Sequence, residues 1–341
     1  MPILGFDPTD RAVAAFLDAH VSARGAAHWR WKYRPGPAGE PAGFAWREAN
    51  GQILGYIGLM WTTLCTATAQ HRAAWFVDWH VLPGDRAVGV GFGLLRKAEA
   101  AAGVLLTLQG SADTRQILPR LGWKEAAGPK TFVRPLTGRA WAAAATRRLP
   151  APLRPLVAAG AALATPFVRA TAPAAPGGAR LVPVERFDTA HDAVWAARRT
   201  EFAPALRRDS DYLNYFCADY PDGGYRRWVV QQGDAAVGHL ITRIDVDRRG
   251  LRRGRLVDLL WPRANRALSA WLVAAACREL QNDGTDYVEC VASVGDLCGA
   301  LVAAGFRARR PVPIWYHRLP ADAGEPGSWY VTLLDCDRAY R

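Results

Sequence analysis

The sequence lacks the features that mark secreted, metal-binding and membrane-spanning proteins. It has six cysteines, none of them in a Cys-x-x-Cys pair, which argues against a disulfide framework or a zinc site. These are Cys65, Cys217, Cys277, Cys290, Cys298 and Cys336. The first ten residues have no basic start and no long apolar core, so we expect no signal peptide. The apolar stretch 155–168 is interrupted by Pro166 and is too short to span a bilayer. We therefore expect a cytoplasmic protein with reduced thiols.

Composition indicates a folded chain with two domains. Half of the 341 residues are hydrophobic and 22% are charged, which is typical of globular proteins. This length suits two domains of roughly 150 residues each. The formal net charge is +12, and a basic surface could attract the phosphates of coenzyme A (CoA), RNA or an anionic membrane. Because arginine far outnumbers lysine, a general arginine bias explains the charge equally well.

A break in composition separates the two halves. Residues 137–179 are rich in alanine, proline and arginine, and prolines at this density prevent one continuous helix. We predict a first domain at 1–136, this linker, and a second domain at 180–341. Within the linker, the apolar stretch could rest on a membrane surface, but we favour a short interdomain helix.

The two halves repeat one another. At an offset of 183 the matching pairs are Gly55 and Gly238, Gly122 and Gly305, and Trp29 and Tyr212. Phe76–Trp79 matches Leu256–Leu259 at an offset of 180. The shared order of these matches predicts a tandem duplication of one fold.

Residue patterns predict an α/β protein with mixed sheets. In the first half we expect a helix capped by Thr9, and further helices over Gly89–Ala102 and Thr114–Leu121. We expect strands there over Phe44–Ala49, Gln52–Trp61, Ala73–Val81, Val104–Gln109 and Thr131–Leu136. In the second half we expect strands over Trp228–Gln232, Ala236–Arg243, Arg255–Leu260, Tyr287–Val291 and Ser328–Leu334. Asn50-Gly51 predicts a hairpin with a type I′ turn, which requires a positive φ at both residues.

A glycine-rich turn in the first half has the form of an anion site. The strand ending at Val81 is followed by a turn and then by a helix that begins near Gly89 and Gly91. The amides at a helix N-terminus lack intrahelical acceptors, and glycines let a ligand approach the backbone closely. Arg86 adds a cation. No Gly-Lys-Ser/Thr follows, and the glycine spacing is a poor match to a dinucleotide fingerprint.

The string Val81-Leu82-Pro83-Gly84-Asp85-Arg86-Ala87-Val88-Gly89-Val90-Gly91 resembles the GNAT N-acyltransferase signature V-x-P-x-x-R/Q-x-x-G-x-G/A. The downstream Arg120–Trp123 resembles the closing "lGF" of that family, and the resemblance covers about residues 5–136. It implies two tandem GNAT-like domains, each a mostly antiparallel sheet flanked by helices. It also implies that pantetheine lies where two strands splay apart, and that an amide near Val81 polarises the thioester. The pyrophosphate would lie on Arg86, Ala87, Val88, Gly89, Val90 and Gly91.

The general base is where the sequence departs from the family pattern. The family often has a tyrosine four residues before the "GF" glycine, and this position is Leu118. Asp78 and His80 are the remaining candidates, because they alternate to one face of the strand that enters the turn. Asp78 could equally be a structural carboxylate, as its repeat partner Asp258 suggests. A bulge in this strand could change which residues face the cleft.

An aromatic cluster is a candidate acceptor site. Trp29, Trp31 and Tyr33 could line the pocket for the acceptor, although ordinary aromatic packing explains them equally well. In the second half the corresponding turn, Trp261–Leu268, has no glycine, so we expect a damaged acyl-CoA site there. This second domain could instead shape the acceptor cleft.

The resemblance implies an N-acyltransferase that uses acetyl-CoA or another acyl-CoA as cosubstrate, without a metal. We expect a small-molecule amine as acceptor and no DNA partner, and the intact pyrophosphate turn favours CoA over tRNA. Two alternatives stay open at this point. One is a FemABX-like transferase that uses aminoacyl-tRNA, and the other is a non-catalytic acyl-CoA sensor or scaffold.

Overall fold

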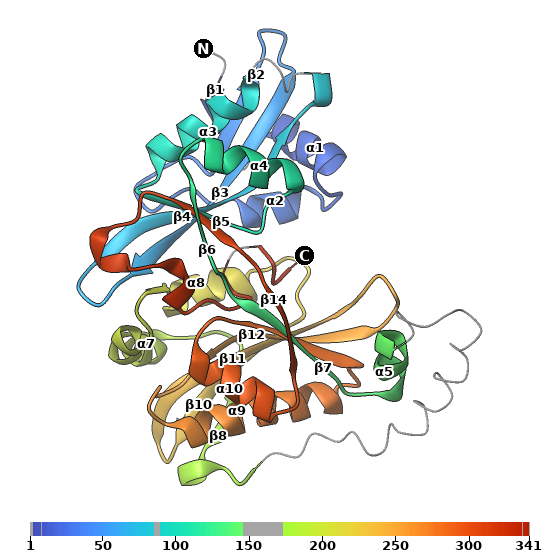
Figure 1. The fold of residues 1–341 in the computed structure, drawn as a ribbon, viewed down its shortest axis with the longest axis vertical. Helices are drawn as coiled ribbons and strands as arrows, with labels where there is room; N and C mark the ends of the chain where they lie inside the picture. Colours follow the sequence, from blue (N-terminus) through green and yellow to red (C-terminus); the bar gives the residue numbers. More distant parts are fainter. Residues whose placement is uncertain (1–2, 8, 85–88, 146–172, 336, 341) are drawn as a thin grey trace.

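The computed structural model describes residues 3–7, 9–84, 89–145, 173–335 and 337–340. Two mixed sheets, each flanked by helices, lie one above the other along the longest axis, and the C-terminus lies between them (Figure 1). This arrangement confirms the predicted α/β class and the presence of two similar domains.

The first sheet has the order β1-β2-β3-β4-β5-β15-β6, with β9 added to β3. Its strands are β1 (Ile3–Gly5), β2 (Gly43–Arg47), β3 (Ile53–Cys65), β4 (Gln70–Val81), β5 (Val104–Leu108), β6 (Lys124–Ala126), β9 (Ala205–Leu206) and β15 (Ile314–His317). Among the described pairs of this sheet, only β4 and β5 run parallel. The sheet is therefore mostly antiparallel, as expected.

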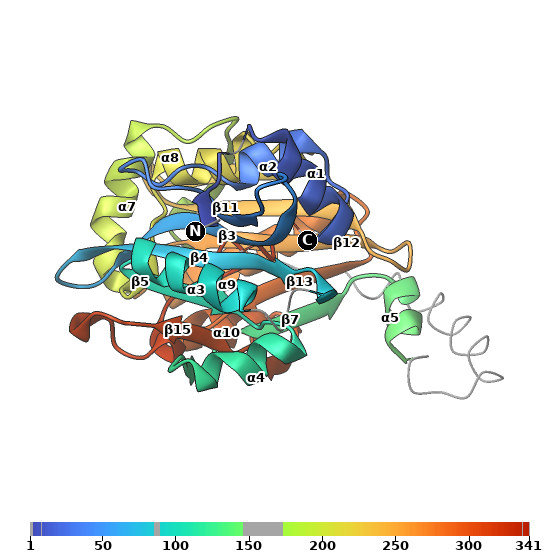
Figure 2. The same ribbon diagram turned by 90° about the horizontal axis from the view of Figure 1, so that it is seen from above.

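Helices cover both faces of the first sheet (Figure 2). The helices α1 (Arg11–His20) and α2 (Ala26–Lys32) pack on one face, and α3 (Val90–Ala101) and α4 (Ala112–Arg120) pack on the other. The predicted cap of the first helix is wrong by one residue. Asp10 caps α1 by accepting hydrogen bonds from the amides of Ala12 and Val13, as a short carboxylate at this position commonly does.

The predicted hairpin at Asn50-Gly51 is confirmed, but its turn type is not. Gly51 has φ +88°, whereas Asn50 is not among the residues with a positive φ. The loop between β2 and β3 is longer than two residues, and the amide of Gly51 donates to the carbonyl of Glu48. A longer loop removes the need for two successive left-handed residues.

The second sheet has the order β14-β7-β13-β12-β11-β10-β8. Its strands are β7 (Lys130–Pro135), β8 (Arg180–Pro183), β10 (Tyr225–Gln232), β11 (Ala235–Val246), β12 (Arg252–Leu260), β13 (Tyr287–Ala292) and β14 (Arg307–Pro311). The helices of this half are α5 (Gly138–Ala145), α7 (Thr189–Phe202), α8 (Ser210–Leu213), η6 (Asn214–Ala218), α9 (Arg266–Asn282) and α10 (Gly295–Ala303), with single turns η5 (Pro176–Gly178), η7 (Ala321–Ala323) and η8 (Pro326–Ser328). Within the described part of this sheet, β12 and β13 form the parallel pair.

The two halves of the chain exchange strands. The predicted strand at 131–136 forms as β7, but it pairs with β13 and β14 of the second sheet. In return, β15 from the second half lies between β5 and β6 of the first sheet. The predicted domain boundaries at residues 136 and 180 stay predictions. Each sheet contains a strand from the other half of the chain, so the sheets do not divide the chain at these residues. Residues 146–172, most of the predicted linker, lie outside the described residues, as does its apolar stretch.

One predicted strand is wrong. Residues 328–334 form no strand beyond an isolated bridge of Tyr330 to Ala205, although Trp329–Asp335 is almost wholly buried. The five described cysteines are free thiols, and Cys336 lies outside the described residues. No helix in the described ranges is long and apolar enough to cross a bilayer.

Candidate functional site

The parallel strands β4 and β5 separate partway along their length. Their pairing runs from Ala73–Val104 to Trp75–Leu106 and ends there, although β4 continues to Val81. A cavity of about 550 Å³ lies at this separation. Its walls in the first domain are Phe76, Val77, Asp78, Trp79, Thr107, Leu108, Gln109, Gly110, Ser111 and Thr114. Among the described residues the β4–β5 pairing thus ends at Trp75, and the cavity begins there, where a ligand inserted between the two strands would lie.

A bulge in β4 turns Asp78 toward α2. The register with β3 shifts between the pairs Tyr56–His80 and Gly58–Val77, which leaves one extra residue on β4. Asp78 lies in this bulge with φ +52°, a left-handed conformation that is uncommon for a residue other than glycine. Such strained positions are concentrated at functional sites.

The Asp78 carboxylate lies in a buried polar cluster. Its Oδ2 accepts hydrogen bonds from the Lys32 ammonium and the Tyr33 hydroxyl, both on or next to α2. Lys32 Nζ also lies 3.4 Å from Asp337 Oδ2. Burial, followed by the charge of Asp78, raises the pKa of Tyr33 well above its usual value, so the hydroxyl stays protonated and donates. These contacts hold the carboxylate in one orientation at the wall of the cavity.

His80 lies apart from the cavity lining. Its ring stacks on that of His20 with centroids 5.6 Å apart, and Phe16 of α1 lies at 6.0 Å. Both His80 and Asp78 therefore face the helices α1 and α2, as their alternation predicted, but only Asp78 is among the residues that line the cavity. The catalytic role of either residue stays a prediction.

The turn that follows β4 leads into the N-terminus of α3. Arg86, Ala87 and Val88 lie outside the described residues, so nothing is added to their predicted role. Gly89 is the N-cap of α3 with φ +80°, and no side chain caps the helix. A side chain at Gly91 would lie 3.3 Å from Trp79 and Val81, which explains the need for a small residue there. The first amides of α3 have no intrahelical acceptor and remain suited to an anion.

The aromatic cluster is packed inside the protein. Trp29, Trp31 and Tyr33 are all buried, and none lines the cavity between β4 and β5. The indole N–H of Trp31 donates to the carbonyl of Tyr215 at 2.7 Å, which links α2 to η6 in the second domain. Aromatic packing between domains thus accounts for their positions. Their predicted contact with an acceptor stays untested.

Two oddities of the sequence have structural explanations. Leu118 is fully buried against α3 and the sheet, so its side chain points into the core. Glu99 is a carboxylate on the buried face of α3; it accepts a hydrogen bond from the Trp123 indole at 2.8 Å and pairs with Arg96 at 2.7 Å. Burial of a carboxylate is tolerated when it is paired in this way.

The second domain supplies the opposite wall of the cavity. Arg253, Arg255, Glu289, Asp337 and Arg338 line this side. Arg253 and Glu289 also line a larger cavity of about 1200 Å³, so the two spaces adjoin. Six arginines and two carboxylates line the larger cavity, which also contains Trp141: Arg24, Arg248, Arg249, Arg253, Arg307 and Arg309, with Asp247 and Glu289.

Sequence reasoning did not identify Lys32, Glu289 or Asp337 as site residues. A lysine within an aromatic run carries no motif, and Asp337 reaches the first domain only because the chain returns to it at its end. The sequence carries one weak signal for Lys32, which lies among the aromatic residues Trp29, Trp31 and Tyr33. If these three are buried, the lysine beside them is buried too, and buried lysines are rare.

Comparisons with known proteins find no matching family model and no matching curated protein. Solved structures do match. A GCN5-related N-acetyltransferase from Anabaena variabilis has a TM-score of 0.61 and 12% identity, over 92% of this chain and 72% of that one. N-myristoyltransferase from Saccharomyces cerevisiae, solved with myristoyl-CoA, has a TM-score of 0.61 and 14% identity, over 96% and 87%. A probable N-acyltransferase from Enterococcus faecalis matches with a TM-score of 0.59, 10% identity and coverage of 92% and 71%.

The chain has the tandem GNAT fold. The fold resemblance predicted from the turn is therefore confirmed over most of the chain, and not only over residues 5–136. In the tandem GNAT fold of this chain, the open separation of parallel strands lies in the first sheet, next to the glycine-rich turn.

Proposed function

We propose that the protein transfers an acyl group from acyl-CoA to an amine, with acyl-CoA bound in the first domain. The separation of β4 and β5 beside the α3 N-terminus is the observation that carries this proposal. Pantetheine would occupy the gap as an added strand, and its amides would bond to β4 beyond Trp75. The pyrophosphate would lie on the amides from Arg86 to Gly91, and an amide near Val81 would polarise the thioester carbonyl.

The acyl group in this proposal is short, most simply acetyl. The cavity wall includes Gln109, Ser111 and Thr114 from the first domain, and charged residues from the second. A long acyl chain needs an apolar tunnel, because burial of each methylene away from water is what stabilises its binding. The polar lining favours a small group over a fatty acid.

Asp78 is the proposed general base. An aliphatic amine with a pKa near 10 is mostly protonated at neutral pH and must lose a proton before it attacks. Asp78 lies at the cavity wall and is oriented by Lys32 and Tyr33. It would take the proton directly or through one water molecule. The amine then attacks the thioester carbon, the nitrogen of the tetrahedral intermediate loses its second proton to solvent, and the C–S bond breaks. The CoA thiolate leaves and is protonated by solvent.

The acceptor would enter through the larger cavity. This cavity adjoins the first one at Arg253 and Glu289, and cavities between domains are common substrate sites. The six arginines of this cavity favour an acceptor that carries anionic groups besides its amine. The two substrates would meet where the cavities adjoin, at Arg253 and Glu289.

Turnover of acetyl-CoA with a panel of amines tests the proposal. Release of free CoA thiol should require an amine and should be absent in the Gly89→Glu variant. Treatment with ribonuclease should have no effect, which separates this reaction from one that uses aminoacyl-tRNA. Acetyl-CoA binding without turnover of any amine would favour a sensor, and absence of binding would contradict the proposal altogether.

A further inference from the structure

The second sheet repeats the separation seen in the first. The parallel strands β12 and β13 pair from Arg253–Tyr287 to Leu256–Cys290, and the pairing ends there although both strands continue. A register shift with β11 also places a bulge at this point of β12. The second domain therefore retains the strand geometry that forms a ligand slot in the first.

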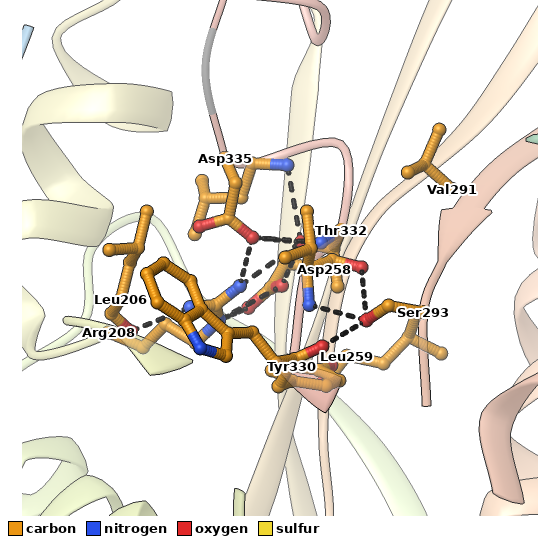
Figure 3. Close-up of polar contacts among 12 residues, drawn as sticks. Leu206, Arg208, Asp258, Leu259, Val291, Ser293, Tyr330, Thr332 and Asp335 are labelled. Atoms are coloured by element: carbon orange, nitrogen blue, oxygen red, sulfur yellow. Dashed lines mark hydrogen bonds and ion pairs between the residues drawn. The ribbon is translucent and has the colours of Figure 1, made fainter. Parts of the chain in front are cut away.

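The end of the chain itself fills this second slot. The amide of Leu334 donates to the carbonyl of Val257 on β12 at 3.1 Å, and the Tyr330 hydroxyl donates to the carbonyl of Leu259. On the other side, Ser293 follows β13 and accepts from the amide of Val331 at 2.8 Å (Figure 3). The segment thus bonds to both separated strands.

Burial of this segment is complete despite its irregular backbone. Each residue from Trp329 to Asp335 has a relative exposure of 1% or less. Irregular segments normally run over the surface because their backbone polar groups need partners. Here the partners come from the slot, as they would for a bound peptide.

A buried polar cluster anchors the segment (Figure 3). Thr332 Oγ1 donates to Asp258 Oδ1 at 2.6 Å, and Asp258 also accepts from Arg208 at 3.0 Å and from His239 at 2.8 Å. Arg208 in turn donates to Asp335 at 2.7 Å. Arg208 therefore joins Asp258 of the slot to Asp335 of the segment. Within the segment, Thr332 and Asp335 are the residues that make these contacts.

Beyond the anchor the chain contacts both domains. The carbonyl of Ala339 accepts from Arg255 at 2.8 Å and from Arg243 at 2.9 Å, both on the second sheet. Asp337 then lies 3.4 Å from Lys32 at the first cavity. The anchored segment and Asp337 are only two residues apart, so the position of one constrains the other.

We propose that the slot of the second domain is a peptide-binding site, occupied by the chain's own residues 329–335, and that this clamp positions Asp337 against Lys32. Arg208, Asp258 and Thr332 are positioning residues in this arrangement. The clamp does not depend on acyl transfer, so it can hold or fail independently of the proposed function.

A cleavable form of the full chain tests the clamp. A protease recognition sequence is inserted between Gly324 and Glu325, which are both exposed, and the chain is cut after folding. The fragment 325–341 should remain with the protein through gel filtration in native buffer. Elution of the fragment apart from the protein would overturn the proposal.

A second arm tests the anchor residues. The cut protein is unfolded in urea and refolded with a fluorescein-labelled synthetic peptide of residues 325–341, and anisotropy reports binding. A peptide with Thr332→Val and Asp335→Asn should bind at least tenfold more weakly, whereas Ser328→Ala, at an exposed position, should match the unchanged peptide. Equal binding by all three would contradict the anchor. If no peptide refolds with the protein, retention of the cut fragment decides the question.

Chemical labelling reads out the position of Asp337 without any acyl transfer. In the intact protein, Lys32 is 2% exposed and should react with acetic anhydride far less than the exposed Lys97. Thr332→Val in the full chain should raise labelling of Lys32 relative to Lys97 at least fivefold, as measured by mass spectrometry. Unchanged labelling of Lys32 in this variant, with the fold intact by circular dichroism, would show that the clamp does not position Asp337.

Discussion

Asp78 and Asp258 occupy corresponding places in the two sheets, yet only Asp78 faces an open cavity. Each lies on a bulged strand just beyond the last pair with its parallel neighbour. Asp78 lines the cavity of about 550 Å³, whereas Asp258 is fully buried beneath Thr332. Both carboxylates are buried, so the two positions differ in what lies beside them: an open cavity in one domain and the chain's own residues in the other.

The first prediction concerns the general base. Asp78→Asn should lower kcat by about 10²–10⁴, the usual range for loss of a general base, and leave the affinity for acetyl-CoA nearly unchanged. His80→Gln should change kcat by less than about threefold, because His80 does not line the cavity. Rates across pH 6–9 with a proven acceptor, and calorimetry with acetyl-CoA, provide the measurements. Wild-type rates in Asp78→Asn would remove this residue from the mechanism, and a large loss in His80→Gln would make His80 the base.

A second prediction concerns the pyrophosphate turn. Gly89→Glu should abolish binding of acetyl-CoA, because it places a side chain and a negative charge at the N-terminus of α3. Gly284→Glu is the matched control. Gly284 has φ +73°, and, as at Gly89, no atom lies close to the position that a Cβ would take. Gly284 lies in the second domain, away from the turn. The control should therefore carry a similar backbone strain and bind normally. Equal affinities in the two variants would show that the turn does not bind CoA.

Much of the acyl-CoA site could be predicted from the sequence, because its signals are local. A strand, a glycine-rich turn and a helix follow one another within about twenty residues, and the repeat offset identified Asp258 as the counterpart of Asp78. The bulge at Asp78 was raised as an option, but its φ of +52° depends on packing against α2. Local patterns thus located the strand that carries the site, and tertiary contacts set the orientation of its side chain.

The exchange of strands could not be predicted in this way. Residues 130–135 and 314–317 are short segments whose patterns do not encode the sheet that they join. Residues 328–334 have the composition of a strand, yet they form an irregular segment because the slot of the second sheet bonds to them on both sides. The composition of residues 328–334 predicted their burial correctly, but it did not predict their irregular backbone conformation.

The third prediction concerns Leu118, the position at which the family often has a tyrosine. The sequence alone suggests that Leu118→Tyr gives a small gain in rate. Because Leu118 is fully buried in the core, the larger side chain should instead destabilise the fold by about 1–3 kcal/mol without any gain in kcat. Urea denaturation and steady-state kinetics measure the two effects. A stable variant with at least a tenfold higher kcat would place this residue in the site after all.

The fourth prediction is a loss of stability in mild acid. Burial, followed by the nearby charge of Lys32, lowers the pKa of His28 from 6.5 to about 4. The unfolded chain therefore takes up a proton at higher pH than the native protein, and the stability present above pH 6.5 is lost as the pH falls toward 4. At pH 5 this amounts to about 2 kcal/mol. Urea denaturation at pH 7 and pH 5 should show the difference, and His28→Asn should reduce it; an unchanged pH dependence in His28→Asn would exclude His28 as its source.

The measurement that tests the central claim most directly is the stoichiometry of acetyl-CoA binding by titration calorimetry. The open separation of β4 and β5 is the single predicted site, since residues 329–335 fill its counterpart in the second sheet. The account predicts one acetyl-CoA per chain. A stoichiometry of two would contradict the assignment of the site to the first domain alone, and absence of binding would contradict the acyl-CoA site itself.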